Sequence, residues 1–179
     1  MLYPNKLLIR GVNPVRPTPV SFSRSQRALH WIMALLILFN LLFSDDLVRW
    51  GVLYYGNKPI PDDVQLSANI HAYVGIAVLI LALIRLALRF IQGVPPEPEG
   101  EPAIFRLLSK VAHWTFYLMF IVMPLAGIAG YYFDSGAAAL AHANQMKLVM
   151  WFLIITHIAA VAVHQFYWKT GILKRMTTG

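Results

Sequence analysis

Residues 64–84 read VQLSANIHAYVGIAVLILALI, a run of 21 residues without Asp, Glu, Lys or Arg. At a rise of about 1.5 Å per residue, a helix of this length covers about 30 Å, the thickness of the hydrocarbon core of a bilayer. Three further uncharged runs, of 17, 23 and 21 residues, occupy residues 28–44, 111–133 and 148–168. Four such runs in 179 residues predict four membrane-spanning helices.

The composition of the whole chain supports a lipid environment. Hydrophobic residues make up 58% and charged residues 13%, against about 45–50% and about 25% in soluble domains. This balance disfavours a soluble protein with buried helices. The first apolar run begins only at Ala28, behind a tail with five basic residues, and no small-residue cleavage site follows it. We therefore interpret it as an uncleaved helix rather than a signal peptide.

The expected fold class is all-α, a transmembrane four-helix bundle without internal repeats. We place the spans at about residues 28–46, 64–88, 108–133 and 138–168, inside one domain at residues 21–176 that follows an N-terminal tail at residues 1–20.

Three connections join the spans. We expect an outer loop at residues 45–63 and a solvated Pro- and Glu-rich connection at residues 90–103. The turn at residues 134–136 is very short, so the third and fourth spans should be antiparallel neighbours.

Basic residues are distributed unequally between the two ends of the predicted spans. Twelve of the 15 lie in the N-terminal tail, the second connection and the C-terminal tail, and only Arg49, Lys58 and Lys147 lie on the other side. The positive-inside rule therefore places both termini in the cytoplasm. The net charge of +7 is then explained by the orientation of the protein in the membrane. We therefore expect no nucleic-acid partner.

Several chemistries are excluded by residues that the chain lacks. It has no cysteine, which excludes disulfides, iron–sulfur clusters, thiolate zinc sites and covalently attached c-type haem. No HExxH motif, phosphate loop or dinucleotide fingerprint occurs, and the four runs contain no acid. Proton-relay pumps and most cation transporters are therefore disfavoured. Six histidines are the abundant metal-binding residues that remain.

Four of the six histidines fall into two layers. His71 and His142 lie near the outer ends of two different predicted helices, and His30 and His157 share the inner level. By helical rise the layers are about 20 Å apart. Two imidazoles from facing helices, at each of two depths, suit two b-type haems with bis-histidine ligation. We therefore predict these four histidines as the axial iron ligands.

The inner layer admits more than one pairing. His113 competes with His157 as the partner of His30, whereas His164 lies seven residues beyond His157 and at the headgroup level. We assign His113 a secondary role, such as hydrogen bonding to a propionate or a quinone. Arg85 lies deep enough to reach an inner haem propionate. A lone histidine more often makes an interhelical hydrogen bond, so a non-redox structural membrane subunit is kept as an alternative.

Five segments occur in a recognisable order. They are SFSRSQRALHW (21–31), IHAYVGIAVLILALIRLALR (70–89), VPPEPEG (94–100), AHWTFYLMFIVMPLAG (112–127) and THIAAVAVHQFYWKTGILKRM (156–176). With these segments the chain resembles, over residues 21–176, the bacterial cytochrome b(561) family. Members of that family are small dihaem membrane proteins that exchange electrons with quinone.

The resemblance implies cofactors, partners and a location. It implies two haem b groups on the same four histidines, a multi-pass location in the bacterial inner membrane, and ubiquinone as an exchangeable redox partner. It places the quinone near the inner end, where His164 and Lys169 match the terminal motif. In family members characterised as superoxide oxidases, electrons from superoxide outside pass through the haems to ubiquinone.

Two departures from the family pattern have structural consequences. The family spacing would place the outer ligand of the fourth helix at Ala143, one residue after His142. A bulge or a turned helix must therefore compensate if His142 is the ligand. The outer turn after the third span is also shorter than usual, which removes part of an outer substrate site or clears a docking surface.

We expect transmembrane electron transfer between a periplasmic donor, superoxide or a redox protein, and ubiquinone. The alternative is a cytochrome b anchor subunit that passes electrons between quinone and a dehydrogenase or c-type cytochrome of a larger complex. The protein would resemble a superoxide:ubiquinone oxidoreductase only if it acts alone. No residue is assigned a catalytic role.

Overall fold

The computed structural model describes residues 19–98 and 100–179 and contains no strand within them. Four helices are long and apolar enough to cross a membrane: Arg24–Leu42, Asp62–Gln92, Ala103–Tyr132 and Gly136–Tyr167. In each helix, only 11–17% of an apolar 18-residue window is buried inside the structure. Most of these apolar side chains therefore face outwards, as they do in a membrane span. The predicted all-α fold with four candidate spans is confirmed. Of the predicted tail, residues 1–18 lie outside the described residues.

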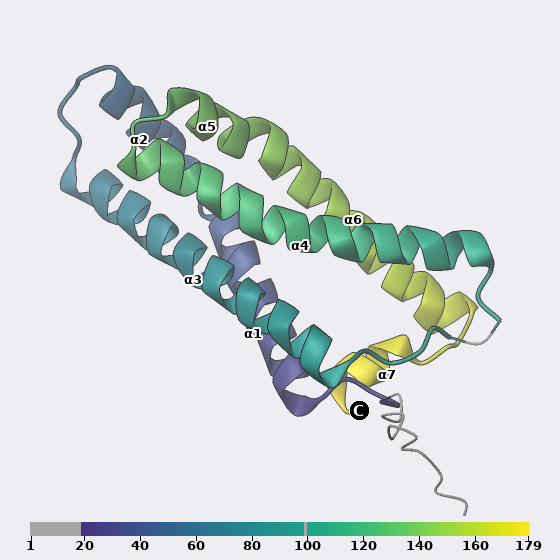
Figure 1. Cartoon of the computed structure of the whole chain (residues 1–179). Helices are drawn as coiled ribbons and strands as arrows, with labels where there is room; N and C mark the ends of the chain where they lie inside the picture. Colours follow the sequence, from purple (N-terminus) through teal and green to yellow (C-terminus); the bar gives the residue numbers. More distant parts are fainter. Residues whose placement is uncertain (1–18, 99) are drawn as a thin grey trace, which may run out of the picture.

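The first three spans are continuous α-helices, and the fourth is composite (Figure 1). They are α1 (Arg24–Leu42), α3 (Asp62–Gln92) and α4 (Ala103–Tyr132). The fourth span runs through α5 (Gly136–Ala141), the π-helix η1 (His142–Met146), α6 (Lys147–Ala162) and the π-helix η2 (Val163–Tyr167). A π-helix holds one extra residue in a turn, so it changes the direction of the side chains on one side of it relative to the other.

Local sequence signals explain where the long helices begin and end. Ser23 accepts a hydrogen bond from the Gln26 N–H, and the Gln26 side chain accepts one from the Ser23 N–H, which forms a capping box at the start of α1. α3 begins directly after Pro61. It ends at Gly93, whose φ of +74° is a conformation that glycine adopts without steric cost.

Residues 45–63 were predicted to be an outer loop, and this prediction is wrong for the first half of the segment. Residues Asp45–Tyr55 form a further helix, α2, whose apolar side chains at intervals of three residues include the buried Trp50. Trp50 packs against Val64 and Ala68 of α3, both fully buried. The helix is short and amphipathic, so it escapes a search for uncharged runs.

The interior of the bundle lies between α1, α3, α4 and α6. α3 packs against α1, α2 and α4, while α4 also packs against α5, η1 and α6 (Figure 1). One buried cluster joins α1, α4 and α6, and a second joins α1 and α3. Phe120 of α4 packs against both clusters, so the middle of the bundle is filled by apolar side chains from every span.

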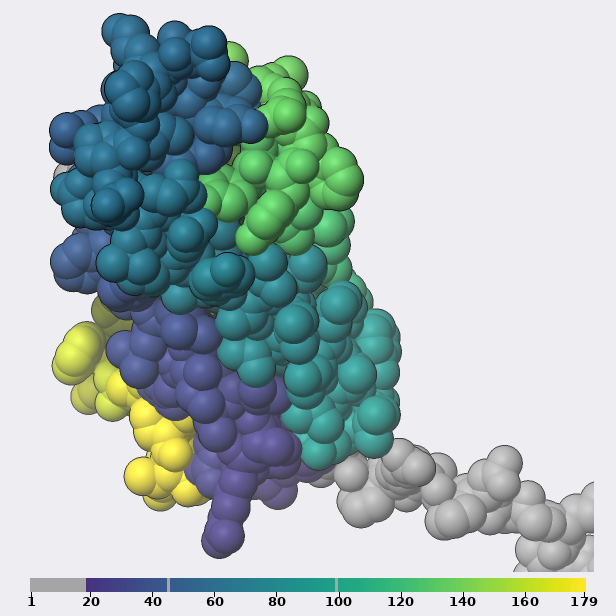
Figure 2. Space-filling view, turned by 90° about the vertical axis from the view of Figure 1, so that its left-hand side faces the viewer, coloured from purple at the N-terminus to yellow at the C-terminus, as the bar shows by residue number. Residues whose placement is uncertain are grey.

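The two ends of the bundle differ in charge. We call the end with α2 and the α4–α5 turn the acidic end, because it holds Asp45, Asp46, Asp62, Asp63 and Asp134. The opposite end, the basic end, holds the start of α1 and the short helix α7 (Ile172–Thr177). There Trp31 donates a hydrogen bond to the Met176 carbonyl, 3.0 Å, and Figure 2 shows α7 lying beside α1.

Candidate functional site

The acidic-end pair consists of His71 on α3 and His142 on η1. Their ring centres lie 5.9 Å apart with an angle of 77° between the ring planes. The two residues come from helices separated by α4 in the chain, so only the folded bundle brings them together. The structure therefore joins the two histidines that depth alone had paired at the outer level.

His142 is held in a fixed orientation by α4. Its Nδ1 lies 2.8 Å from the Met123 carbonyl oxygen, and because a carbonyl only accepts, Nδ1 must carry the proton. Nε2 then keeps its lone pair for a metal, in the tautomer that a hydrogen-bonded ligand adopts. On the other side of the pair, Nδ1 of His71 is buried and has no hydrogen-bond partner among residues 19–98 and 100–179.

A glycine makes room for the His142 ring. A Cβ atom added to Gly127 of α4 would lie 3.1 Å from Cε1 and 3.2 Å from Nδ1 of His142. Such contacts are tighter than ordinary van der Waals packing, so any larger residue would push the imidazole aside. Gly127 therefore belongs to the site, although it was not among the predicted site residues.

The π-helix η1 explains the unusual spacing of the two histidines on the fourth span. The bulge expected from that spacing is present, and it begins at His142 itself. One extra residue in the turn offsets the extra residue between His142 and His157. His142 thus faces the bundle interior from the position that a regular helix would give to a residue one place later.

The basic-end pair consists of His30 on α1 and His157 on α6, with ring centres 6.3 Å apart and an interplanar angle of 62°. Phe116 of α4 contacts the His157 ring edge to face at 5.6 Å. His157 lies within regular α-helix, so its direction needs no bulge. The structure brings together the pair predicted for the inner level.

A third histidine also lies next to His157. The ring centres of His113 and His157 are 5.9 Å apart, and His113 Nδ1 bonds to the Ser109 carbonyl of its own helix at 2.6 Å. His113 was expected to compete with His157 as the partner of His30, whereas in the structure both His30 and His113 lie beside His157. The open choice is therefore which of these two is the partner of His157. His113 is more exposed than His30, which favours a supporting role for it.

Arg85 of α3 lies among the basic-end histidines. Its guanidinium acts electrostatically on His30, His113 and His157. None of the ion pairs found among the described residues includes Arg85. A half-buried guanidinium near three imidazoles is placed to bind an acidic group such as a propionate.

The remaining two candidate residues, His164 and Lys169, differ in exposure. His164 on η2 is buried, and its Nε2 lies 3.4 Å from Oε1 of Glu101 in the connection before α4. Lys169 is exposed and has a φ of +54°. The partnership with Glu101 was not predicted, because the direction of a side chain in a Pro-rich connection depends on the folded structure.

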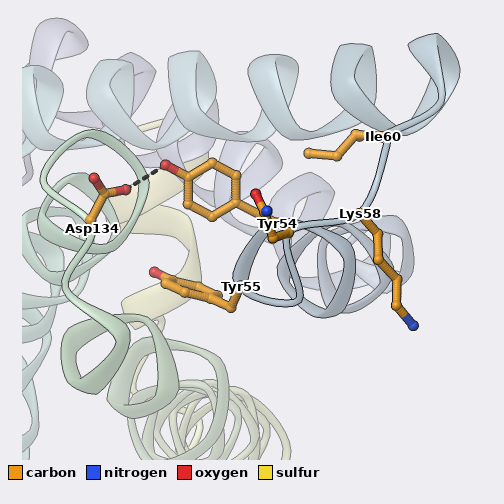
Figure 3. A pocket seen from close by; sticks show the side chains of 6 residues that line it. Tyr54, Tyr55, Lys58, Ile60 and Asp134 are labelled. Atoms are coloured by element: carbon orange, nitrogen blue, oxygen red, sulfur yellow. Dashed lines mark hydrogen bonds between the residues drawn. The ribbon is translucent and has the colours of Figure 1, made fainter.

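A surface pocket of about 440 Å³ opens at the acidic end (Figure 3). It is lined by Tyr54, Tyr55, Asn57, Lys58, Ile60 and Asp134. The hydrogen bond from the Tyr54 hydroxyl to Asp134 raises the pKa of Tyr54 above its usual value. This pocket was not predicted, because the whole of residues 45–63 was expected to be loop.

Comparison with known proteins identifies the family. The sequence profile described as prokaryotic cytochrome b561 matches residues 21–179. The chain belongs to the prokaryotic cytochrome b561 family. It is 30% identical over 158 residues to a protein named cytochrome b562 from Cereibacter sphaeroides, with 87% of this chain and 94% of that protein covered. It is 26% identical over 176 residues to a probable superoxide oxidase CybB from Yersinia pestis, with the same coverage of 87% and 94%.

Membership in the cytochrome b561 family means that this is a multi-pass membrane protein that transfers electrons with b-type haem. The two histidine pairs fit such a cofactor. In each pair the two imidazoles come from different spans, and their ring centres lie 5.9 and 6.3 Å apart. Each pair would therefore be able to hold one b-type haem between two helices.

The number of protein ligands at each site also fits. No group of three or more His, Asp or Glu side chains able to hold a metal was found in residues 19–98 and 100–179. An iron that already has four porphyrin nitrogens needs only two axial ligands, and each pair offers two imidazoles. Each pair would therefore supply the protein ligands that one b-type haem needs.

Proposed function

We propose that the protein carries electrons across the bacterial inner membrane, from a donor at the acidic end, which faces the periplasm, to ubiquinone at the basic end, which faces the cytoplasm. Two haem b groups would supply the one-electron chemistry, one held by His71 and His142 and the other by His30 and His157. The observation that carries this proposal is that two imidazole pairs occupy opposite halves of one bundle, each pair joining two spans.

The residues between the pairs support transfer over this distance. The two layers are about 20 Å apart by helical rise, and the space between them holds Met119, Phe120 and Leu153 with their apolar neighbours. The ring centres of Phe116 and Phe120 lie 5.5 Å apart. This packed apolar core excludes water from the path between the two pairs.

The charge of the acidic end favours a protein donor with a basic surface. Five aspartates stand against Arg49, Lys58 and Lys147 at this end, so it attracts cations and repels anions. A periplasmic redox protein, or a redox subunit of a larger complex for which this chain is the anchor, matches this chemistry.

Superoxide is the second candidate donor. The similarity to a probable superoxide oxidase over 87% of the chain supports it, whereas the charge of the acidic end opposes the approach of an anion.

Stopped-flow reduction of the oxidised haem separates the two donors. A reduced cationic c-type cytochrome should reduce the haem at a rate that falls steeply with added salt, because the attraction is electrostatic. Superoxide should react no faster than it disproportionates without a catalyst. Fast reduction by superoxide together with no reaction of the cationic cytochrome would make the protein a stand-alone superoxide:ubiquinone oxidoreductase.

A further inference from the structure

The second π-helix carries a histidine that haem ligation does not use. η2 begins at Val163, and its second residue, His164, is only 8% exposed. π-helices are rare and are found mostly at functional sites. The other π-helix of this span begins at His142. Both π-helices of the described residues therefore direct an imidazole, and the role of the second one needs an explanation.

The imidazole of His164 is bonded at both nitrogens. Nε2 lies 3.4 Å from Glu101 Oε1, and Nδ1 lies 2.9 Å from the Thr170 hydroxyl oxygen. The His164 and Glu101 side chains are only 10% and 4% exposed. Three groups that can each give and take a proton therefore form a continuous chain at the basic end of the bundle.

Glu101 differs from its neighbour Glu97 in the same connection. Glu97 is 39% exposed and bonds to Lys110 at 2.7 Å, and this hydrogen bond lowers the pKa of Glu97 below its usual value. Glu101 is buried, and its ion-pair partner among the described residues is the imidazole of His164, not a lysine or arginine. A carboxyl group beside a histidine, away from permanent cations, is the arrangement that proteins use for general acid–base chemistry.

The other charged groups near η2 are engaged elsewhere or lie at the surface. On α4, Arg106 and Lys110 face Glu97. On α7, which packs against η2, Arg175 donates to the Pro96 carbonyl at 2.7 Å, and Lys174 is exposed. Lys169, next to Thr170, is exposed as well. Glu101 is thus the carboxyl group that acts directly on His164.

We propose that Glu101, His164 and Thr170 form a proton relay that serves ubiquinone at the basic end. This inference rests on the proposed function and adds the route of one proton. Reduction of a quinone to a quinol takes two electrons, supplied one at a time by the donor through the protein, and two protons. Without a relay, protons would reach the quinone only from water in direct contact with it.

One proton moves along the chain in a single direction. The Glu101 carboxyl proton passes to His164 Nε2 while the Nδ1 proton passes to the Thr170 oxygen. The Thr170 hydroxyl donates to the His164 carbonyl oxygen at 3.5 Å. It rotates away from this oxygen and its O–H bond breaks as the proton passes to the reduced quinone oxygen, where a new O–H bond forms. Glu101 is left as a carboxylate and regains its proton from water. His164 is left with its proton on Nε2 instead of Nδ1, so the imidazole must rotate or return this proton before the relay carries a second one. His164 and Glu101 act through Thr170, which is the group that touches the quinone.

The experiment compares Glu101→Gln with Glu97→Gln, a matched change in the same connection. Pre-reduced protein in detergent is mixed in a stopped-flow instrument with ubiquinone carrying a short tail, and haem oxidation is followed optically. Ferricyanide, which accepts an electron without a proton, is the second oxidant. We expect Glu101→Gln to slow oxidation by ubiquinone at least tenfold, more at alkaline than at acidic pH, and to leave the haem spectrum and the ferricyanide rate unchanged. Glu97→Gln should behave as the unmodified protein.

Thr170→Val is the second test of the relay, since it keeps the Glu101–His164 contact and removes only the hydroxyl group. It should slow the ubiquinone reaction to a similar extent. Unchanged ubiquinone rates in Glu101→Gln and Thr170→Val would overturn the relay, as would an equal loss with ferricyanide, which indicates a structural defect. If ubiquinone fails to oxidise the unmodified protein while ferricyanide succeeds, the proposed function itself fails.

Discussion

The two histidine pairs are similar in separation but differ in how the chain holds them. At the acidic end, His142 is directed by a π-helix, fixed by the Met123 carbonyl and fitted against Gly127. At the basic end, His157 lies in regular helix and has two imidazoles within about 6 Å, those of His30 and His113. At the acidic end, several contacts therefore fix a single pair of histidines. At the basic end, His157 has a second neighbouring imidazole that could replace its partner.

This difference shows where each site is sensitive. A site with a single ligand pair and a fitted glycine should lose its cofactor when any of these parts changes. A site with a spare imidazole nearby should tolerate more changes, because a neighbouring nitrogen can replace a lost ligand. The following changes test that contrast, beginning with the largest expected effect.

Replacing His142 with alanine should remove the acidic-end haem and leave the basic-end haem in place. No third histidine contacts His71 or His142 in the described part of the chain, so no other imidazole replaces the lost ligand. Haem content should fall to about half, measured as the pyridine complex of the extracted haem. Retention of full haem content would show that His142 is not the ligand.

Replacing His30 with alanine and His113 with alanine should separate the two candidate partners of His157. We expect His30→Ala to lose most of the basic-end haem, with a remainder bound through His113 that has a shifted spectrum. The His113→Ala protein should keep its full haem content and show only a changed midpoint potential, because a polar neighbour has been lost. The haem content and an optically followed redox titration check this. If His113→Ala loses the basic-end haem and His30→Ala keeps it, His113 is the ligand and His30 has the supporting role.

Replacing Gly127 with alanine should disturb the acidic-end haem alone. The added Cβ would lie 3.1 Å from the His142 ring, so we expect lower occupancy or a shifted midpoint potential at that site. Gly51→Ala is the matched control, since nothing lies within 4 Å of its added Cβ. That control should keep both haems and gain up to about 1 kcal/mol of helix stability. Equal spectra for the two variants would show that the ring is not confined by Gly127.

Deleting Gln145 should have the smallest effect of these changes. The deletion removes one residue from η1 and converts it to regular α-helix. The spacing between His142 and His157 then becomes the family spacing, and both histidines keep their directions. We expect both haems to be retained. Selective loss of the acidic-end haem would show that η1 does more than absorb an extra residue.

Much of this architecture could be predicted from the sequence because it depends on length and charge alone. Uncharged runs located the spans, and helical rise placed His71 with His142 and His30 with His157 at two depths. The spacing of the fourth span even required the bulge that η1 provides. These features follow from one-dimensional counting along each helix.

The features that were missed depend on contacts between elements. α2 is stabilised by Trp50 packing on α3, which no uncharged run reports. Glu101 reaches His164 only because η2 turns the imidazole toward the connection before α4. The place of Gly127 against the His142 ring depends on the relative position of α4 and η1. Counting along a helix gives depth, but it does not give the direction of a side chain beyond a bulge or in a loop.

The most direct test of the account is the number of haem b groups bound to the purified protein. Haem extracted as its pyridine complex is divided by the protein concentration, and the dithionite-reduced spectrum identifies the type. We predict two b-type haems per chain, one for each histidine pair. A preparation saturated at one haem per chain, or containing none, would contradict the claim that both pairs are haem sites.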